Sequence, residues 1–226
     1  MFANFFSSAA AEPEKAEASE SRGKPLIVIT GITGFIGSHL LAHCIDSLAG
    51  EYRIRGTARN PSDYDKMEPL YNYFGGEEAL KARVEIVHAD LQDADSIDQA
   101  VQGASYVIHT ANPVGLSEPT DPNEMVLPSL QGALSIMRAA SKHGVKRVVI
   151  TSSAAAIESQ TPETMLCHPV LDESHWSQLN AEGVRVSAYG KSKTIAEKAA
   201  WNFLKEIPDD AQKPELVTIL PGLVLG

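Results

Sequence analysis

The stretch from Leu26 to Gly37, LIVITGITGFIG, constrains the fold of this chain more than any other. It opens with a run of apolar and β-branched residues, a pattern typical of a strand buried on both faces of a parallel sheet. Gly31, Gly34 and Gly37 follow at three-residue spacing, and apolar residues then recur with the period of a helix. The glycines therefore lie at a predicted strand–turn–helix junction.

A junction of this kind can bind a dinucleotide. The first glycine makes the tight turn, the second lets the backbone approach a pyrophosphate, and the third lets the helix pack closely on the strand. The N–H groups at the helix start then face the phosphates. The spacing is GxxGxxG rather than the commoner GxGxxG. A nucleotide loop is our interpretation, and a glycine-rich turn without a ligand is the alternative.

Beyond this junction, strand and helix patterns alternate along the chain. Such alternation predicts an α/β fold, a doubly wound (Rossmann) parallel sheet with helices on both faces. Ligands in such sheets bind at the carboxyl ends of the strands. The expected strands are 26–30, 52–58, 84–88, 106–111, 147–152 and 216–220, and the expected helices are 35–48, 63–74, 95–102, 123–143 and 188–205, with an irregular stretch before the last helix.

Composition limits the function classes. The 226 residues carry a net charge of -10, which gives no support to nucleic-acid binding. No apolar run approaches the length of about 20 residues that a membrane span needs. Cys44 and Cys167 lie far apart and suggest neither a metal site nor a disulfide framework, so a reduced, cytoplasmic location is the simplest expectation. We expect residues 1–23, acidic and rich in Ala and Ser, to form a disordered tail and residues 24–226 to form the nucleotide-binding domain.

The predicted strand ends carry candidate cofactor contacts. Arg59 follows the second strand, where an NAD-preferring site would place Asp or Glu for the ribose 2′-hydroxyl. Arg59 instead suits a 2′-phosphate, with Lys66 as a second charge, although both could be solvated loop residues. Asp90 follows the third strand and could accept from an adenine amino group or cap the next helix.

A candidate catalytic group combines a serine with a Tyr–Lys pair. Tyr189 and Lys193 are four residues apart in YGKSK, so a helix places them on one face. A free tyrosine has a pKa of about 10, and a neighbouring ammonium favours the phenolate. Thr151, Ser152 and Ser153 supply hydroxyls at the end of the fifth strand. A Tyr–Lys pair at this spacing indicates a catalytic site only in combination with the serines and the glycine loop upstream.

These motifs resemble those of the extended short-chain dehydrogenase/reductase superfamily. TGxxGFIG, RxxxR, ADL, TSS, YxxSK and PxLVxG all occur, and DESHWS and AEKAAW are similar to the dihydroflavonol 4-reductase and cinnamoyl-CoA reductase group. The resemblance covers residues 26–226 and implies an NADPH-dependent reductase of a small carbonyl substrate. It implies that Ser153, Tyr189 and Lys193 are catalytic. It implies cofactor contacts from Gly31, Thr33, Gly34, Phe35, Ile36, Gly37, Arg59, Lys66, Asp90, Leu91, Thr110, Ala111, Asn112, Tyr189, Lys193, Pro221 and Val224.

Two departures keep rival functions open. The family continues well past PxLVxG, so the C-terminal substrate lobe is expected to be missing from this chain. Glu158 stands where plant dihydroflavonol reductases usually carry Asn or Asp, which weakens a flavonoid assignment. One alternative is a non-catalytic nucleotide-binding protein. Another is a nucleotide-sugar epimerase or 3β-hydroxysteroid dehydrogenase relative, which more often has an acidic residue at the position of Arg59.

Overall fold

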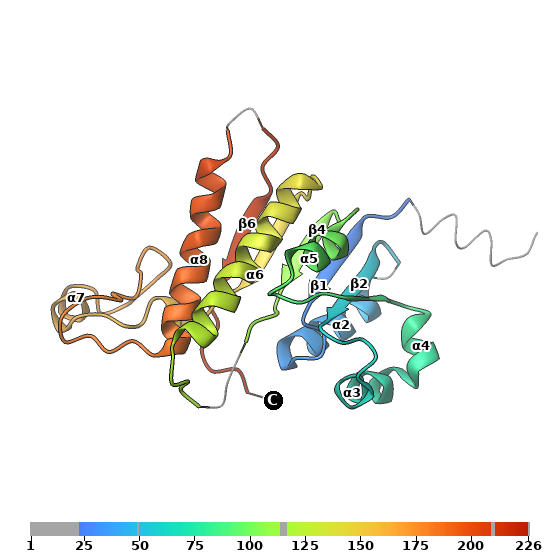
Figure 1. Cartoon of the computed structure of the whole chain (residues 1–226), viewed down its shortest axis with the longest axis horizontal. Helices are drawn as coiled ribbons and strands as arrows, with labels where there is room; N and C mark the ends of the chain where they lie inside the picture. Colours follow the sequence, from blue (N-terminus) through green and yellow to red (C-terminus); the bar gives the residue numbers. More distant parts are fainter. Residues whose placement is uncertain (1–22, 49, 114–116, 209–210, 226) are drawn as a thin grey trace, which may run out of the picture.

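The computed structural model describes residues 23–48, 50–113, 117–208 and 211–225, so nearly all of the predicted tail lies outside the described residues. Its centre is a six-stranded parallel sheet in the order β3-β2-β1-β4-β5-β6 (Figure 1). This is the doubly wound order in which the strand sequence reverses between β1 and β4. The strands are β1 (Leu26–Thr30), β2 (Arg53–Ala58), β3 (Glu85–His88), β4 (Tyr106–His109), β5 (Arg147–Thr151) and β6 (Glu215–Ile219).

Helices connect these strands. They are α2 (Phe35–Leu48), α3 (Tyr64–Phe74), α4 (Glu77–Lys81), α5 (Ala94–Val101), α6 (Asn123–Lys142), the 3-10 turn η1 (Ala154–Ala156), α7 (Pro162–Cys167) and α8 (Ala188–Glu206). The helices α6 and α8 lie side by side, and the segment that carries α7 projects beyond α8, away from the sheet (Figure 1). No helix among the described residues is long and apolar enough to cross a membrane.

The central strand β1 is buried along its whole length because both faces of the sheet are covered there. Leu26 and Val28 point into one core with residues of α5, α6 and α8. Ile27 and Ile29 point into a second core with residues of α2 and α3. Alternate residues of a strand face opposite sides, so an apolar residue is needed at every position. This explains the continuous apolar run that the sequence shows.

The last strand, β6, is covered differently. Leu216 packs in the same core as α6 and α8. On the other face, Val217 is 37% exposed and Ile219 is 50% exposed. The described helices therefore cover both faces of the sheet at β1 and one face at β6.

The sequence-based elements agree with this fold to within one or two residues, except for three short ones. We expected no helix at α4, η1 or α7. The helix α7 has no buried residue, so it leaves no apolar periodicity to detect. The helix α4 has five residues and follows two glycines, which the sequence indicates as a break.

Candidate functional site

The parallel sheet brings the predicted site residues to one edge. Gly31 follows β1, Arg59 follows β2, Thr110 follows β4 and Ser153 lies just past β5. All strands run in the same direction, so their carboxyl ends share that edge. The sequence motifs, although dispersed over almost 200 residues, therefore belong to one region of the molecule.

Packing inside the protein requires glycine at the first and third positions of the loop. Gly31 has a φ of +73°, and a Cβ there would lie 2.8 Å from Cα of Ala111. A Cβ on Gly37 would lie 2.2 Å from the carbonyl oxygen of Gly31 and 2.9 Å from Oγ1 of Thr110. The third glycine thus lets α2 approach the end of β1, as the sequence predicted.

Gly34 is different, because its surroundings leave room for a side chain. A Cβ there would meet only the carbonyl oxygen of Gly31, at 3.4 Å. The loop passes directly into α2, whose first turn includes Phe35 and Ile36 and contains no acidic residue. The first N–H groups of a helix have no acceptor within it and carry partial positive charge. The space at Gly34 and the helix start together suit the close approach of a phosphate.

A buried hydrogen-bond network joins the ends of β1 and β4. Oγ1 of Thr30 accepts from the N–H groups of Thr110, at 3.1 Å, and Ala111, at 3.2 Å. The Thr30 hydroxyl therefore donates its own proton to Nδ1 of His109, at 2.8 Å. Burial, with a smaller effect of the Lys193 charge, lowers the pKa of His109 to about 3, so this imidazole is neutral. The network holds Ala111 against Gly31.

The side chain of Asn112, next in this loop, is also fixed. Its Oδ1 accepts from the hydroxyl of Ser129 in α6, at 2.9 Å, and its Nδ2 donates to the carbonyl of Pro113, at 3.1 Å. The segment from Thr110 to Asn112 is therefore anchored to both β1 and α6.

At the β2 and β3 ends, the groups expected at the adenosine end of a cofactor are exposed or half-buried. The side chain of Arg59 is exposed, and its carbonyl accepts from Nδ1 of His88 at 2.8 Å. Lys66 lies in the first turn of α3, where its N–H donates to the capping carboxylate of Asp63. Lys66 therefore projects from a helix that begins five residues after Arg59.

The structure settles the helix-cap alternative for Asp90. The residue that caps α5 is Asp93, which accepts from the N–H groups of Asp95 and Ser96. The Asp90 carboxylate accepts from the N–H of Gln92, at 2.9 Å. Its neighbour Leu91 packs against Gly132 of α6, where a Cβ would lie 2.7 Å from Cδ2 of Leu91.

The first two turns of α8 bring the Tyr–Lys pair together. Ser187 caps the helix, and its hydroxyl accepts from the N–H of Gly190. Nζ of Lys193 lies 5.7 Å from the ring centroid of Tyr189 and donates to the carbonyl of Thr151, at 2.9 Å. The ammonium therefore bridges the tyrosine and the end of β5, two residues before Ser153.

Burial sets the electrostatics of Lys193. The residue is 7% exposed. This burial lowers the pKa of Lys193 to about 8, and the nearby charge of Glu197 opposes the shift. The group is thus still mostly an ammonium near neutral pH and can lose its proton in mildly alkaline solution.

Ser153 lies in the connection that follows β5. It is buried, and its hydroxyl accepts from the N–H of Ala155 and so caps η1. The adjacent Ala154 donates its N–H to the carbonyl of Pro221, at 2.9 Å. That bond brings the Pro221 segment, which includes Val224, beside the end of β5.

The sequence did not single out two buried polar residues of this region. His109 stands in an otherwise apolar strand, and Glu197 lies four residues after Lys193 on α8. The spacing of Tyr189, Lys193 and Glu197 was a usable signal for the second, because it places all three on one helical face. Thr30 and Ser152, their partners, are 79 and 45 residues away, and no local pattern shows such pairs.

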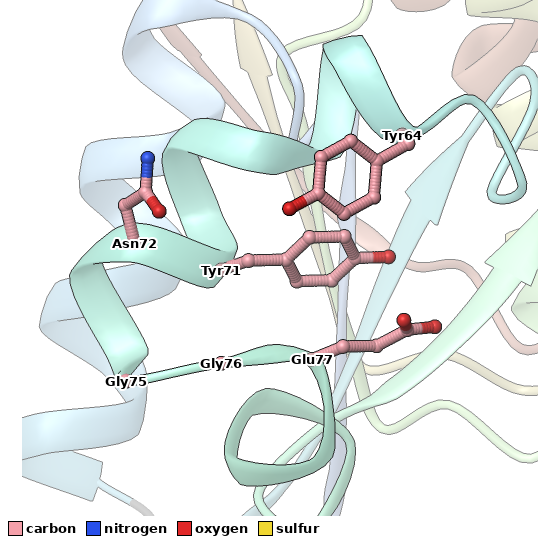
Figure 2. Close-up of a pocket in the computed structure, with 6 residues that line it drawn as sticks. All are labelled: Tyr64, Tyr71, Asn72, Gly75, Gly76 and Glu77. Atoms are coloured by element: carbon pink, nitrogen blue, oxygen red, sulfur yellow. The ribbon is translucent and has the colours of Figure 1, made fainter.

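A surface depression lies elsewhere, between α3 and α4. Its lining residues are Tyr64, Tyr71, Asn72, Gly75, Gly76 and Glu77 (Figure 2). The rings of Tyr64 and Tyr71 face one another, with centroids 5.5 Å apart, and the Glu77 carboxylate extends beside them. None of the predicted site residues lines this depression. Across the described residues, no group of three His, Cys, Asp or Glu residues could hold a metal ion.

The chain belongs to the NAD dependent epimerase/dehydratase family, whose model matches residues 27–207. It is similar to dihydroflavonol 4-reductase of Callistephus chinensis, with 38% identity over 208 residues, 89% of this chain and 52% of that protein. It is also similar to cinnamoyl-CoA reductase 1 of Arabidopsis thaliana, with 37% identity over 203 residues, 88% of this chain and 53% of that protein. The predicted resemblance to this reductase group is confirmed.

Solved structures agree with the fold. Yeast methylglyoxal/isovaleraldehyde reductase Gre2 complexed with NADPH matches 87% of this chain and 57% of its own chain, with a TM-score of 0.67 and 27% identity. Gre2 of Candida albicans, also in complex with NADPH, matches 89% and 59%, with a TM-score of 0.69 and 28% identity. The chain thus spans about half the length of the curated relatives it matches.

Proposed function

We propose that this chain is an NADPH-dependent reductase of aldehydes or ketones, with Ser153, Tyr189 and Lys193 as its catalytic residues. The observation that carries the proposal is the buried Lys193 ammonium, which lies beside the Tyr189 ring and donates to the end of β5. A positive charge beside a phenol stabilises the phenolate left after proton donation. The glycine loop stands at the same edge of the sheet.

Each residue has a distinct role in this proposal. NADPH, when bound, supplies the hydride. Tyr189 donates a proton to the carbonyl oxygen, Lys193 stabilises the phenolate that forms, and the Ser153 hydroxyl orients the carbonyl oxygen. The cofactor contacts proposed from the resemblance are Gly31, Thr33, Gly34, Phe35, Ile36, Gly37, Arg59, Lys66, Asp90, Leu91, Thr110, Ala111, Asn112, Tyr189, Lys193, Pro221 and Val224. The space beside Gly34 and the uncompensated start of α2 support the phosphate part of this set.

The test is NADPH consumption over a panel of aldehydes, α-dicarbonyls and flavanones. We expect Tyr189→Phe to lower kcat about a hundredfold or more, because positioned acid–base groups commonly contribute that much. NADPH should still raise the melting temperature of the variant. Tyr73→Phe, at an exposed tyrosine that belongs to none of the proposed contacts, is the matched control and should keep its rate. A Tyr189→Phe chain with the native rate would rule out Tyr189 as the proton donor.

A second candidate is NADPH binding without turnover. Leu223 and Leu225, on either side of Val224, are 88% and 82% exposed, so this segment is open to solvent in the described chain. Hydride transfer benefits from a site closed to water. A rise in melting temperature with NADPH, combined with no turnover on any carbonyl of the panel, would favour this candidate.

A further inference from the structure

Glu197 is a buried carboxylate to which the proposed reaction assigns no role. It is 5% exposed and lies on the face of α8 that carries Tyr189 and Lys193. Its Oε2 accepts from the hydroxyl of Ser152, and its Oε1 accepts from Nε1 of Trp201, at 3.4 Å. Both oxygens act as acceptors, which is what an ionised carboxylate requires.

The charge of Glu197 lies close enough to act on the buried Lys193 ammonium through space. Lys193 and Glu197 lie one helical turn apart, and they bond to consecutive residues of one strand end: Lys193 to the Thr151 carbonyl and Glu197 to the Ser152 hydroxyl. Buried charges are costly unless an opposite charge and hydrogen bonds compensate them. The Glu197 charge therefore offsets part of the cost of burying the Lys193 ammonium.

Other charged groups have little effect on the Lys193 ammonium. His109 faces Lys193 from β4 but is neutral, as described above. Glu118 accepts from the N–H of Ala188 at the start of α8, more than one turn before Lys193, and is exposed. The buried residues of α6 include no charged side chain, and η1 consists of alanines. Among the described residues, Glu197 is the charge that acts on the Lys193 ammonium.

We propose that Glu197 is a positioning residue that keeps Lys193 protonated and held against the end of β5, while Ser152 and Trp201 fix the carboxylate in place. This inference rests on the proposed function, in which a charged Lys193 serves Tyr189. It adds a fourth residue, buried and out of contact with substrate, to the group on this face of α8.

The experiment follows the Lys193 side chain by NMR. The full chain is labelled with 13C at the lysine ε-carbons, and the Lys193 signal is identified by its loss in Lys193→Met. The native midpoint is expected near 8. In Glu197→Gln, which removes the charge at nearly constant shape, the midpoint should fall by about one pH unit, a tenfold change in the acid dissociation constant. Glu206→Gln, at an exposed position on the same helix, is the matched control and should leave it unchanged.

An unchanged Lys193 midpoint in a folded Glu197→Gln chain overturns the proposal. If that variant fails to fold, Glu197→Asp replaces it, because it keeps the charge but withdraws it by one methylene. Its midpoint should fall by about half a unit, and an unchanged or raised midpoint overturns the proposal.

The titration uses neither NADPH nor a substrate, so its result stands even if the chain proves not to be a reductase. Where NADPH oxidation is measurable, the alkaline decline of kcat should move to lower pH together with the Lys193 midpoint. A decline that stays in place while the midpoint moves would overturn the link between Glu197 and the reaction. A chain without turnover would count against the proposed function alone.

Discussion

The strands β1 and β6 have similar apolar content but different surroundings. In β1, LIVIT, every residue is buried between two layers of helices. In β6, ELVTI, Leu216 is buried under α6 and α8, while Val217 and Ile219 on the other face are exposed. A strand with one solvated face usually carries polar residues there. The sequence of β6 is therefore that of a strand covered on both faces, and its burial in the described chain is that of a strand covered on one.

The same contrast separates the two ends of the site. At the β1 end, backbone packing fixes the glycine loop so closely that two of its glycines cannot accept a methyl group. At the β6 end, Pro221 is held by one backbone bond, and the leucines beyond it are exposed. The glycine loop after β1 is thus closely packed, whereas the described segment after β6 is largely exposed.

The largest expected effect comes from adding a methyl group inside the rigid end. Gly37→Ala should lower the free energy of unfolding by about 3 kcal/mol, because the new Cβ meets the Gly31 backbone at 2.2 Å. Urea denaturation monitored by circular dichroism measures this loss. Gly50→Ala is the control, since a Cβ there meets nothing within 4 Å.

Gly34→Ala sharpens the first prediction, because a methyl group there should obstruct a bound phosphate without disturbing the packing of the protein itself. Its stability should stay within about 0.5 kcal/mol of the native value, while its affinity for NADPH falls at least about tenfold. A destabilised Gly34→Ala chain would show that the loop packs as tightly at Gly34 as at Gly37.

The next prediction compares β1 and β6 directly, through the same change of valine to threonine in each strand. Val28→Thr buries a hydroxyl in a core without partners and should cost about 2 kcal/mol of unfolding free energy. Val217→Thr places the same hydroxyl on the open face of β6 and should cost less than about 0.5 kcal/mol. Equal losses, measured by the same urea titration, would mean that Val217 is covered in solution.

A third test concerns the pH dependence of stability that the buried Lys193 confers. The folded chain holds the pKa of Lys193 at about 8, below the value of 10.5 for the free side chain. Between these values the unfolded chain binds the extra proton, so stability from this group increases as pH rises from 8 to 10.5. Over this pH range, the free energy of unfolding of the native chain should therefore rise by about 2 kcal/mol relative to that of Lys193→Met. A constant difference between the two chains would show that Lys193 keeps an ordinary pKa.

The smallest effect concerns cofactor choice at the exposed β2 end. A guanidinium can bind a phosphate with two charge-assisted hydrogen bonds, and an exposed site should give the lower part of their range. We expect NADPH to bind about tenfold more tightly than NADH and Arg59→Ala to remove that preference. Arg53→Ala, a change of a partly buried arginine at the opposite end of β2, is the charge control. Equal dissociation constants in the native chain would refute the NADPH preference.

The sequence predicted what local patterns encode. Apolar runs located the strands, helical spacing placed Tyr189 and Lys193 on one face, and alternation gave the sheet class. It could not show the bonds from Thr30 to His109 or from Ser152 to Glu197, since these pairs meet only after the sheet has formed. It also missed α7, whose residues are all at least partly exposed and so carry no periodic signal.

The bond between Thr30 and His109 has a consequence for folding. These residues are 79 positions apart, and the β1–β4 pairing they belong to is the most distant in sequence within the sheet. Closing so long a loop costs entropy before any contact repays it, so pairings of this range slow the search for the native state. The glycine loop reaches its final form against Ala111 only when this seam is closed. A nucleotide that binds at this loop therefore binds only after β1 and β4 have paired. It should slow unfolding more than it speeds folding.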